Sequence, residues 1–236
     1  ERDAHAAPSH HPIPLDMGRR AARATKNRPR RPAPLDRAGS AAHLRPMVEE
    51  HDGSLGGRLL IAMPGMGDPR FARSVVYICS HSDEGAMGLV VNRRAEGVTY
   101  AELMEQLSIE LGPESQRSAV HYGGPVEMGR GFVLHSSDFH VEDSTLRVAP
   151  GISLTATLDV LRAMAAGCGP ERRMVALGYS GWGPNQLEEE MQRNGWLSCD
   201  ADEEILFSDR DAAKWEMALG KLGVDPSVLS ATGGSA

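Results

Sequence analysis

The sequence predicts an α+β fold built on a mixed sheet, and three of its features lead to that prediction. About eight short apolar runs have the length and the β-branched content of strands, and about four segments have helical spacing. In the first half of the chain these runs follow one another, whereas in the second half they alternate with helices. Two early runs are joined by so few residues that an antiparallel hairpin is the simplest connection.

Three strands are expected at the start of the globular part. They are the buried run 58–63 (RLLIAM), the β-branched and aromatic run 74–80 (SVVYICS) and the run 87–92 (MGLVVN). A cluster of proline and glycine at 64–69 separates the first two, and Asp83-Glu84-Gly85 turns the second into the third. The second and third runs are therefore expected to form the hairpin.

Helices and further short strands are expected downstream. One helix begins after Thr99, because Glu102 stands three residues on and completes a capping box. Apolar spacing predicts a second helix over 155–166 and a last helix over 209–222, capped by Ser208. Further short strands are expected at 120–122, 131–135, 146–154 (one strand or two), 196–199 and 205–207.

The segment Met174–Met191 is expected to organise the rest of the chain. It is predicted to begin with a buried strand, 174–177, and to end with a helix, 184–193, that opens at a proline. The turn between them is hinged by Gly178, Gly181 and Gly183. Trp182 lies at the corner in this interpretation.

Three regions are expected along the chain. Residues 1–54 are predicted to form a disordered extension, because they are rich in proline, alanine and arginine and lack apolar periodicity. Residues 55–230 are expected to form a single globular domain, and 231–236 a disordered polar tail.

The extension is strongly basic between residues 17 and 45, where nine basic side chains stand against one acidic side chain. Such a segment is a nucleic-acid arm or a targeting peptide, or else a solvated tail or sequence upstream of the true start. We favour a solvated tail or sequence upstream of the true start, and we expect Met47 to be the initiator. This leaves open whether residues 1–46 belong to the natural protein.

The net charge of −7 is unevenly distributed. Of 25 Lys/Arg and 32 Asp/Glu, residues 1–50 hold ten and six, which leaves 15 basic and 26 acidic side chains in the rest. An acidic body repels phosphate backbones, whereas nucleic-acid binding needs clustered positive charge. Direct nucleic-acid binding is therefore not expected, except through the basic extension.

Cysteine number and spacing predict a protein of a reducing compartment. Cys79, Cys168 and Cys199 are odd in number, widely spaced and without a CxxC pair, which fits a reducing compartment and argues against a disulfide framework. No apolar run approaches the ~18 residues that a membrane-spanning helix needs, so no membrane partner is expected.

The sequence around Ser180, Gly-Tyr-Ser-Gly-Trp, resembles the GxSxG nucleophile elbow of hydrolases. Tryptophan replaces the last glycine, and no histidine follows His140, so the hydrolase order of serine, acid and histidine cannot occur. An order with histidine first is left open, but nothing specific supports it. We therefore expect no catalytic residue.

Two other patterns suggest ligand chemistry without completing it. Residues 124–131 have the GxxxxG spacing of a phosphate loop, but Arg130 and Gly131 stand where lysine and Ser/Thr are needed. Between His135 and Asp143 lies the densest cluster of ligand-type side chains, in a spacing that no metal geometry demands. Polar and glycine-rich loops are the simpler interpretation, and neither a metal nor a cofactor is expected.

Asp68, Arg73 and Asn92 border the predicted hairpin. An arginine near an aspartate is most often an ion pair that fixes a turn, and we favour that interpretation. The same side chains also suit a pocket for a small anionic ligand, so this alternative stays open.

Three long segments, 57–93, 120–136 and 178–197, resemble in this order the YqgE/AlgH family of bacterial proteins, and the resemblance covers about residues 55–223. Where the family has alanine, this chain has Ser180, which weakens the nucleophile interpretation further. The family's motif positions fall on Pro64, Asp68, Pro69, Arg73, Ser74, Asn92, Gly123, Gly124, Pro125, His135, Gly181, Trp182 and Gln186.

The resemblance implies a compact domain with a twisted, partly barrel-like sheet and packed helices. Together with the residue patterns it predicts a compact α+β domain with a mixed, largely antiparallel twisted sheet and about four helices. It also implies a cytoplasmic protein without an assigned activity. The AlgH name carries an association with transcriptional regulation, but no DNA-binding motif and no catalytic residue come with the resemblance.

We expect a non-catalytic regulatory or interaction protein that acts through a protein partner or a small ligand. The alternative is an enzyme or a small-ligand-binding protein whose pocket is walled by Asp68, Arg73, Asn92 and His135. The other motif residues are expected to shape the backbone: Pro64, Pro69, Gly123, Gly124, Pro125, Gly181, Trp182 and Gln186.

Overall fold

The computed structural model describes residues 53–115, 117–226 and 229. The predictions for residues 1–52, for a start at Met47 and for the tail 231–236 lie outside the described residues.

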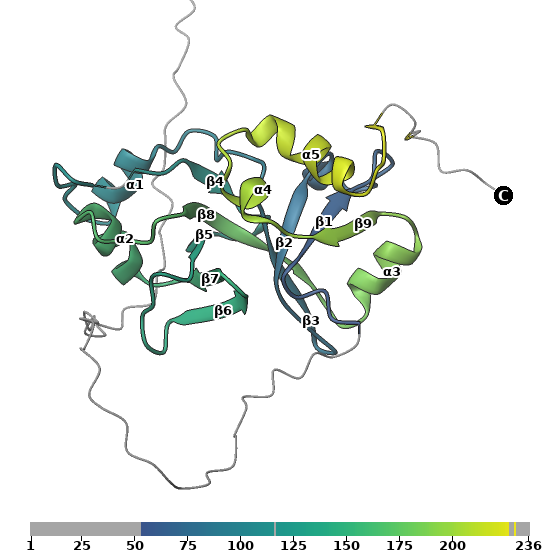
Figure 1. Ribbon diagram of the computed structural model, residues 1–236, viewed down its shortest axis with the longest axis horizontal. Coiled ribbons are helices and arrows are strands. Elements are labelled where there is room, and N and C mark those ends of the chain that lie inside the picture. Colours follow the sequence, from purple (N-terminus) through teal and green to yellow (C-terminus); the bar gives the residue numbers. More distant parts are fainter. Residues whose placement is uncertain (1–52, 116, 227–228, 230–236) are drawn as a thin grey trace, which may run out of the picture.

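Nine strands form one curled sheet that resembles half a barrel, which confirms the α+β prediction (Figure 1). The strands are β1 (Arg58–Ala62), β2 (Val75–Ser82), β3 (Gly85–Val90), β4 (Val120–Tyr122), β5 (Val126–Ser136), β6 (Thr145–Ala149), β7 (Ile152–Thr155), β8 (Arg173–Trp182) and β9 (Trp196–Asp200). Their order is β6-β7-β5-β8-β3-β2-β1-β9, and β4 pairs with β8 beside this path. The β4–β8 pair is parallel and the other named pairs are antiparallel.

Five α-helices and two 3-10 helices accompany the sheet in the described part of the chain. They are η1 (Pro69–Phe71), α1 (Tyr100–Gln106), α2 (Leu158–Ala165), α3 (Gln186–Gln192), α4 (Glu203–Phe207), η2 (Asp211–Ala213) and α5 (Lys214–Lys221). Figure 1 shows α1 and α2 at one end of the sheet, α3 at the opposite end and α5 above β1 and β2.

The long strand β8 joins the two halves of the sheet. Its first half pairs with β4 and β5, and its last residues pair with β3, where Gly88 faces Ser180 and Ala86 faces Trp182. The predicted turn at 178–183 is therefore wrong for residues 178–182, because pairing with β5 and β3 extends β8 through Gly178 and Gly181. Asn185, at a φ of 59°, precedes α3, so that helix begins at Gln186 and not at Pro184.

The predicted Gly-Gly-Pro turn at 123–125 passes very close to β8. A Cβ atom on Gly124 would lie 2.2 Å from the backbone carbon of Tyr179, and the φ of Gly124 is 153°. Only glycine tolerates both the contact and this backbone conformation. The motif glycine therefore lets the chain leave β4 and enter β5 against the middle of β8.

Predictions that rested on neighbouring residues are confirmed. β2 and β3 form the expected antiparallel hairpin, with Val76 opposite Val90. Thr99 caps α1, accepting from the backbone N–H of Glu102 while the Glu102 carboxylate accepts from the backbone N–H of Thr99. Both features depend on contacts within a few residues, which sequence patterns record directly.

Two predictions near the C-terminus are wrong. Residues 205–207 belong to α4 and not to a strand, because Asp202 caps the segment by accepting from the N–H of Ile205. The last helix begins at Lys214 and not at residue 209. Ser208 instead accepts from the N–H of Arg210, and the chain makes a 3-10 turn that brings Asp211 into a buried ion cluster.

The core has three parts. One lies between the sheet and the pair α4 and α5, a second packs α1 and α2 on β4, β5 and β8, and the third joins β1–β3 to α3. The third part contains Trp182, Trp196 and Leu187, and Trp182 also lines the site described next. Over the described residues, the helices are too short or too polar to cross a bilayer.

Candidate functional site

The η1 loop forms one wall of a surface groove. Asp68 caps η1 by accepting from the backbone N–H of Arg70 at 2.9 Å, and the Arg70 guanidinium binds both carboxylate oxygens at 2.7–3.0 Å. These hydrogen bonds hold the pKa of Asp68 below its ordinary value. Asp68 is thus part of an ion pair that fixes a turn, as expected, but its partner is Arg70 and not Arg73.

The aromatic floor of the groove is formed by Phe71 and Trp182, and both rings pack against Trp196, which does not itself line the groove. The ring centroids of Phe71, Trp182 and Trp196 lie 5.5–6.3 Å apart, in stacked and edge-to-face arrangements that aromatic rings prefer. Trp182 comes from the end of β8 and Trp196 from the start of β9. Both indoles are buried, so the cluster is a rigid surface.

A single carboxylate on α3 holds this floor in place. Glu190 Oε2 accepts from the indole N–H of Trp182 at 3.0 Å and from that of Trp196 at 2.8 Å. Its Oε1 accepts from the side-chain amide of Gln186 at 2.9 Å, and the Gln186 oxygen accepts from the N–H of Gly183. We call Glu190 with these three donors the Glu190 clamp. Sequence reasoning missed its central residue, although Glu190 stands one helical turn after the motif residue Gln186.

These parts enclose a groove with a volume of about 430 Å³, which we call the motif groove. It brings together five of the motif residues, Asp68, Pro125, Gly181, Trp182 and Gln186. Its remaining lining residues are Gly65, Met66, Gly67, Arg70, Phe71, Val126, Glu190, Arg193, Asn194 and Gly195. Pro64 and Pro69 flank the loop that carries Asp68, and Gly123 and Gly124 lead into Pro125.

The other three residues expected to wall a ligand pocket lie elsewhere. Arg73 stacks on Trp215, 4.2 Å from the ring centroid, and pairs with Glu216 of α5. Asn92 accepts from the N–H of Val75 and donates to the carbonyl of Arg73, which fixes the approach to β2. The structure therefore does not bring Asp68, Arg73, Asn92 and His135 to one cavity.

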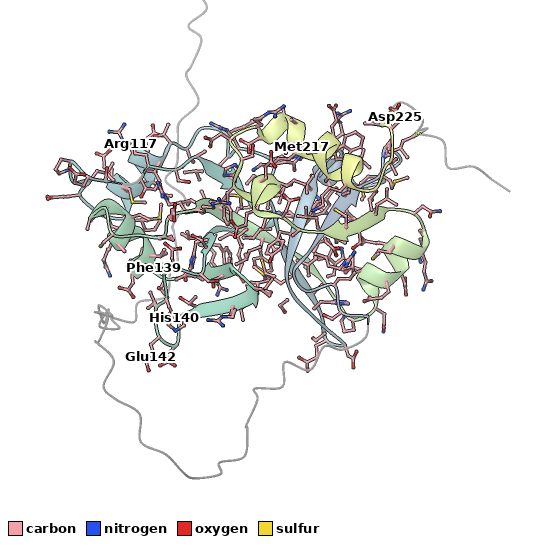
Figure 2. All side chains as sticks on the ribbon, viewed as in Figure 1. Arg117, Phe139, His140, Glu142, Met217 and Asp225 are labelled. Atoms are coloured by element: carbon pink, nitrogen blue, oxygen red, sulfur yellow. The ribbon has the colours of Figure 1, made fainter. Side chains whose placement is uncertain are left out.

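His135 is a buried part of the β5–β7 sheet. Its Nδ1 lies 2.8 Å from the carbonyl of Ser136 and its Nε2 lies 2.9 Å from the hydroxyl of Thr155. Burial lowers the pKa of His135, which favours the neutral ring. His140 lies on the outer loop after β5, next to Phe139 and Glu142 (Figure 2). Within residues 53–115, 117–226 and 229, no three His, Cys, Asp or Glu side chains are grouped to hold a metal.

Ser180 lies inside β8 and is fully buried. Its hydroxyl donates to the carbonyl of Gly123 at 3.3 Å. A nucleophile elbow instead exposes its serine on a sharp turn between a strand and a helix. The geometry of Ser180 is that of a packed strand residue.

Comparison with known proteins places the chain in a family. A family model described as AlgH-like matches residues 59–227, a range that contains every residue lining the motif groove. The chain belongs to the AlgH-like family. A UPF0301 protein of Rhodopseudomonas palustris (strain HaA2) is 52% identical over 214 residues, 88% of this chain and 98% of the relative. Another, from Bradyrhizobium diazoefficiens, is 54% identical over 78% of this chain and 89% of its own length.

Two solved structures have a similar fold. The solution structure of the AlgH protein from Pseudomonas aeruginosa matches with a TM-score of 0.65 and 42% identity, over 80% of this chain and all of that one. The crystal structure of a Corynebacterium diphtheriae protein matches with a TM-score of 0.59 over 73% of this chain and 89% of its own. At 20% identity the second likeness shows the fold alone. The AlgH-like fold is thus shared well beyond close sequence relatives.

Proposed function

We propose that this protein is a non-catalytic interaction protein of the cytoplasm that binds an apolar side chain of a protein partner in the motif groove. The observation that carries the proposal is the Glu190 clamp. Its carboxylate is occupied by two indoles and an amide, so these polar groups hold the shape of an aromatic floor. A pre-formed aromatic surface binds at low entropic cost.

The rim of the groove supports a protein segment as the occupant. Three charged side chains, Asp68, Arg70 and Arg193, line the groove together with the aromatic floor. Asp68 and Arg70 form an ion pair, and Arg193 pairs with Glu189 outside the groove. An apolar centre inside a polar rim is the usual anatomy of a protein–protein interface. Met128, two residues beyond Val126 on β5, lies outside the groove lining but is 55% exposed, and methionine is enriched at interfaces.

A regulatory role is proposed through such a partner and not through direct contact of the domain with DNA. Residues 51–236 carry 15 basic and 26 acidic side chains, a balance that opposes binding to a phosphate backbone. A small apolar ligand in the same groove is the alternative occupant.

Placing a carboxylate in the groove should block the partner. Val126→Glu is expected to weaken a purified partner's binding by about tenfold or more, since a charge would be desolvated against the aromatic floor. The measurement is calorimetric titration with a protein first recovered on the wild-type chain. Leu146→Glu is the matched control, because Leu146 is an exposed apolar residue on β6, outside the groove.

Equal binding by Val126→Glu and wild type would contradict the proposal. So would a metabolite that raises the melting temperature of the wild type but not of Val126→Glu, because a small ligand would then be the occupant. Melting curves of both variants show whether the fold is intact before binding is compared.

Ser180→Ala is expected to be nearly neutral. The change removes one hydrogen bond, worth about 0.5–1.5 kcal/mol. Its acceptor, the carbonyl of Gly123, keeps the N–H of Val90 at 2.8 Å. Denaturant unfolding should therefore show a loss of at most about 1.5 kcal/mol. A hydrolase activity that is present in the wild type and lost in this variant would refute the non-catalytic proposal.

A further inference from the structure

We propose that the domain binds a small phosphate-type oxyanion in a second cavity, at the opposite end of β8 from the motif groove. The cavity lies between the start of β4, the start of β8 and the loop from α4 to η2, and has a volume of about 280 Å³. Figure 1 shows α4 lying beside β8 and β4 at this place. We call it the β4–α4 cavity.

The wall of the β4–α4 cavity is cationic although the domain is acidic. Four basic side chains line it, Arg117, Arg172, Arg173 and Lys214, against two acidic ones, Glu171 and Asp209. Concentrated positive charge in a low-dielectric recess attracts anions. This local excess opposes the balance of residues 51–236 and points to an anionic ligand.

The inner wall is a buried ion cluster. The Asp211 carboxylate accepts from Arg94 Nε at 2.7 Å, Lys214 Nζ at 3.0 Å and His121 Nε2 at 3.1 Å. Lys214 Nζ also donates to the carbonyls of Val91 and Leu206. The Asp211 carboxylate thus faces one permanent cation, Arg94, together with an imidazole and the Lys214 ammonium, whose pKa is lowered by burial, so the cluster has a net positive charge while Lys214 is protonated.

One ring nitrogen of His121 makes no hydrogen bond to the described residues. The residue is 5% exposed and lines the cavity, and its Nδ1 is buried without a hydrogen-bond partner among the described residues. Because Nε2 donates a hydrogen bond to the Asp211 carboxylate, the neutral ring carries its lone pair on Nδ1. A buried polar atom of this kind normally meets water or a ligand. The adjoining cavity has the room for one.

The chemistry of the two walls selects the ligand. Arg117, at the edge of the domain (Figure 2), has no ion-pair partner in the described part of the chain, so its guanidinium is available for a bidentate contact with an oxyanion. A hydrogen-phosphate group also carries an O–H, which can donate to His121 Nδ1 after a small shift of the ring, because that atom is itself buried in the cavity wall. A carboxylate has no such proton, so phosphate is favoured over simple carboxylates.

The experiment is an NMR and calorimetric titration of the full chain with inorganic phosphate at constant ionic strength. Saturable binding is expected, with a shift of the His121 imidazole nitrogens, while His81, paired with Glu188, stays unchanged. Arg117→Gln should weaken binding by about tenfold, the size of one charge-assisted contact. Arg130→Gln is the matched control, because Arg130 is an exposed arginine on β5 that lies outside the cavity.

Several outcomes would overturn the inference: no saturation, an equal effect of Arg117→Gln and Arg130→Gln, or acetate binding as tightly as phosphate. A small phosphomonoester tested in parallel distinguishes the sources. Tighter binding of the ester identifies a phosphorylated metabolite, and tighter binding of the free ion identifies phosphate itself. Because this cavity and the motif groove share no residue, either proposal can fail without the other.

Discussion

Replacing Asp211 by alanine is expected to lower the free energy of unfolding by about 3–5 kcal/mol, the usual cost of removing one partner of a buried ion pair. Lys214 is 1% exposed, so its ammonium would stay in the core with only two backbone carbonyls. His121 and Arg94 would lose the same acceptor. Urea unfolding followed by circular dichroism measures the loss.

Two further variants test the cause. Asp209→Asn removes the same charge two residues away, at an exposed side chain, and is expected to change stability by less than about 0.5 kcal/mol. Adding Lys214→Met to Asp211→Ala removes the stranded ammonium and should recover much of the loss, because an apolar replacement of a buried ion pair is often neutral. A cost for Asp211→Ala no larger than that for Asp209→Asn would contradict the assignment.

The same carboxylate should also contribute to acid unfolding. Burial alone raises the pKa of Asp211, but hydrogen bonds from His121, Arg94 and Lys214 outweigh it, so the pKa lies well below the ordinary 3.8. A carboxyl whose pKa is depressed by folding stabilises fully above its unfolded pKa and loses that contribution as pH falls below it. The stability of the wild type should therefore fall more steeply below about pH 4 than that of Asp211→Asn.

Sequence patterns predicted those parts of the fold that depend on contacts between residues close together in the sequence. The capping box at Thr99 and the β2–β3 hairpin are set by residues that are near neighbours in the sequence. The run at 205–207 was ambiguous, because three apolar residues suit a strand and a short buried helix equally. Its helical state depends on the cap from Asp202 and on burial of Ile205 and Leu206 against the sheet.

At the two sites, as in the fold, sequence patterns predicted features that depend on local contacts and missed those that depend on distant ones. Motif residues such as Asp68 and Gln186 could be named from the sequence, but their convergence depends on β8 continuing through Trp182 to pair with β3. That pairing was hidden by the glycines, which suggested a turn. The β4–α4 cavity left no sequence signal, because His121 and Asp211 meet across 90 residues.

Replacing Glu190 by alanine is expected to lower the free energy of unfolding by about 2–6 kcal/mol, because each of two buried donors left without an acceptor costs about 1–3 kcal/mol. The donors are the indole N–H groups of Trp182 and Trp196, whose side chains are 6% and 2% exposed. Denaturant unfolding followed by tryptophan fluorescence measures the change and reports on the affected rings directly.

Two further variants test whether the loss of stability comes from the missing hydrogen bonds of the Glu190 clamp or from the loss of a negative charge. Glu189→Ala removes a carboxylate one residue away, whose ion pair with Arg193 is exposed, and should cost less than about 1 kcal/mol. Glu190→Gln keeps one oxygen that can accept from both indoles and should recover at least half of the loss. If Glu190→Ala were as stable as Glu189→Ala, the indoles would have found other acceptors. Packing alone would then keep the aromatic floor rigid, and the Glu190 clamp would not account for the fixed shape of the motif groove.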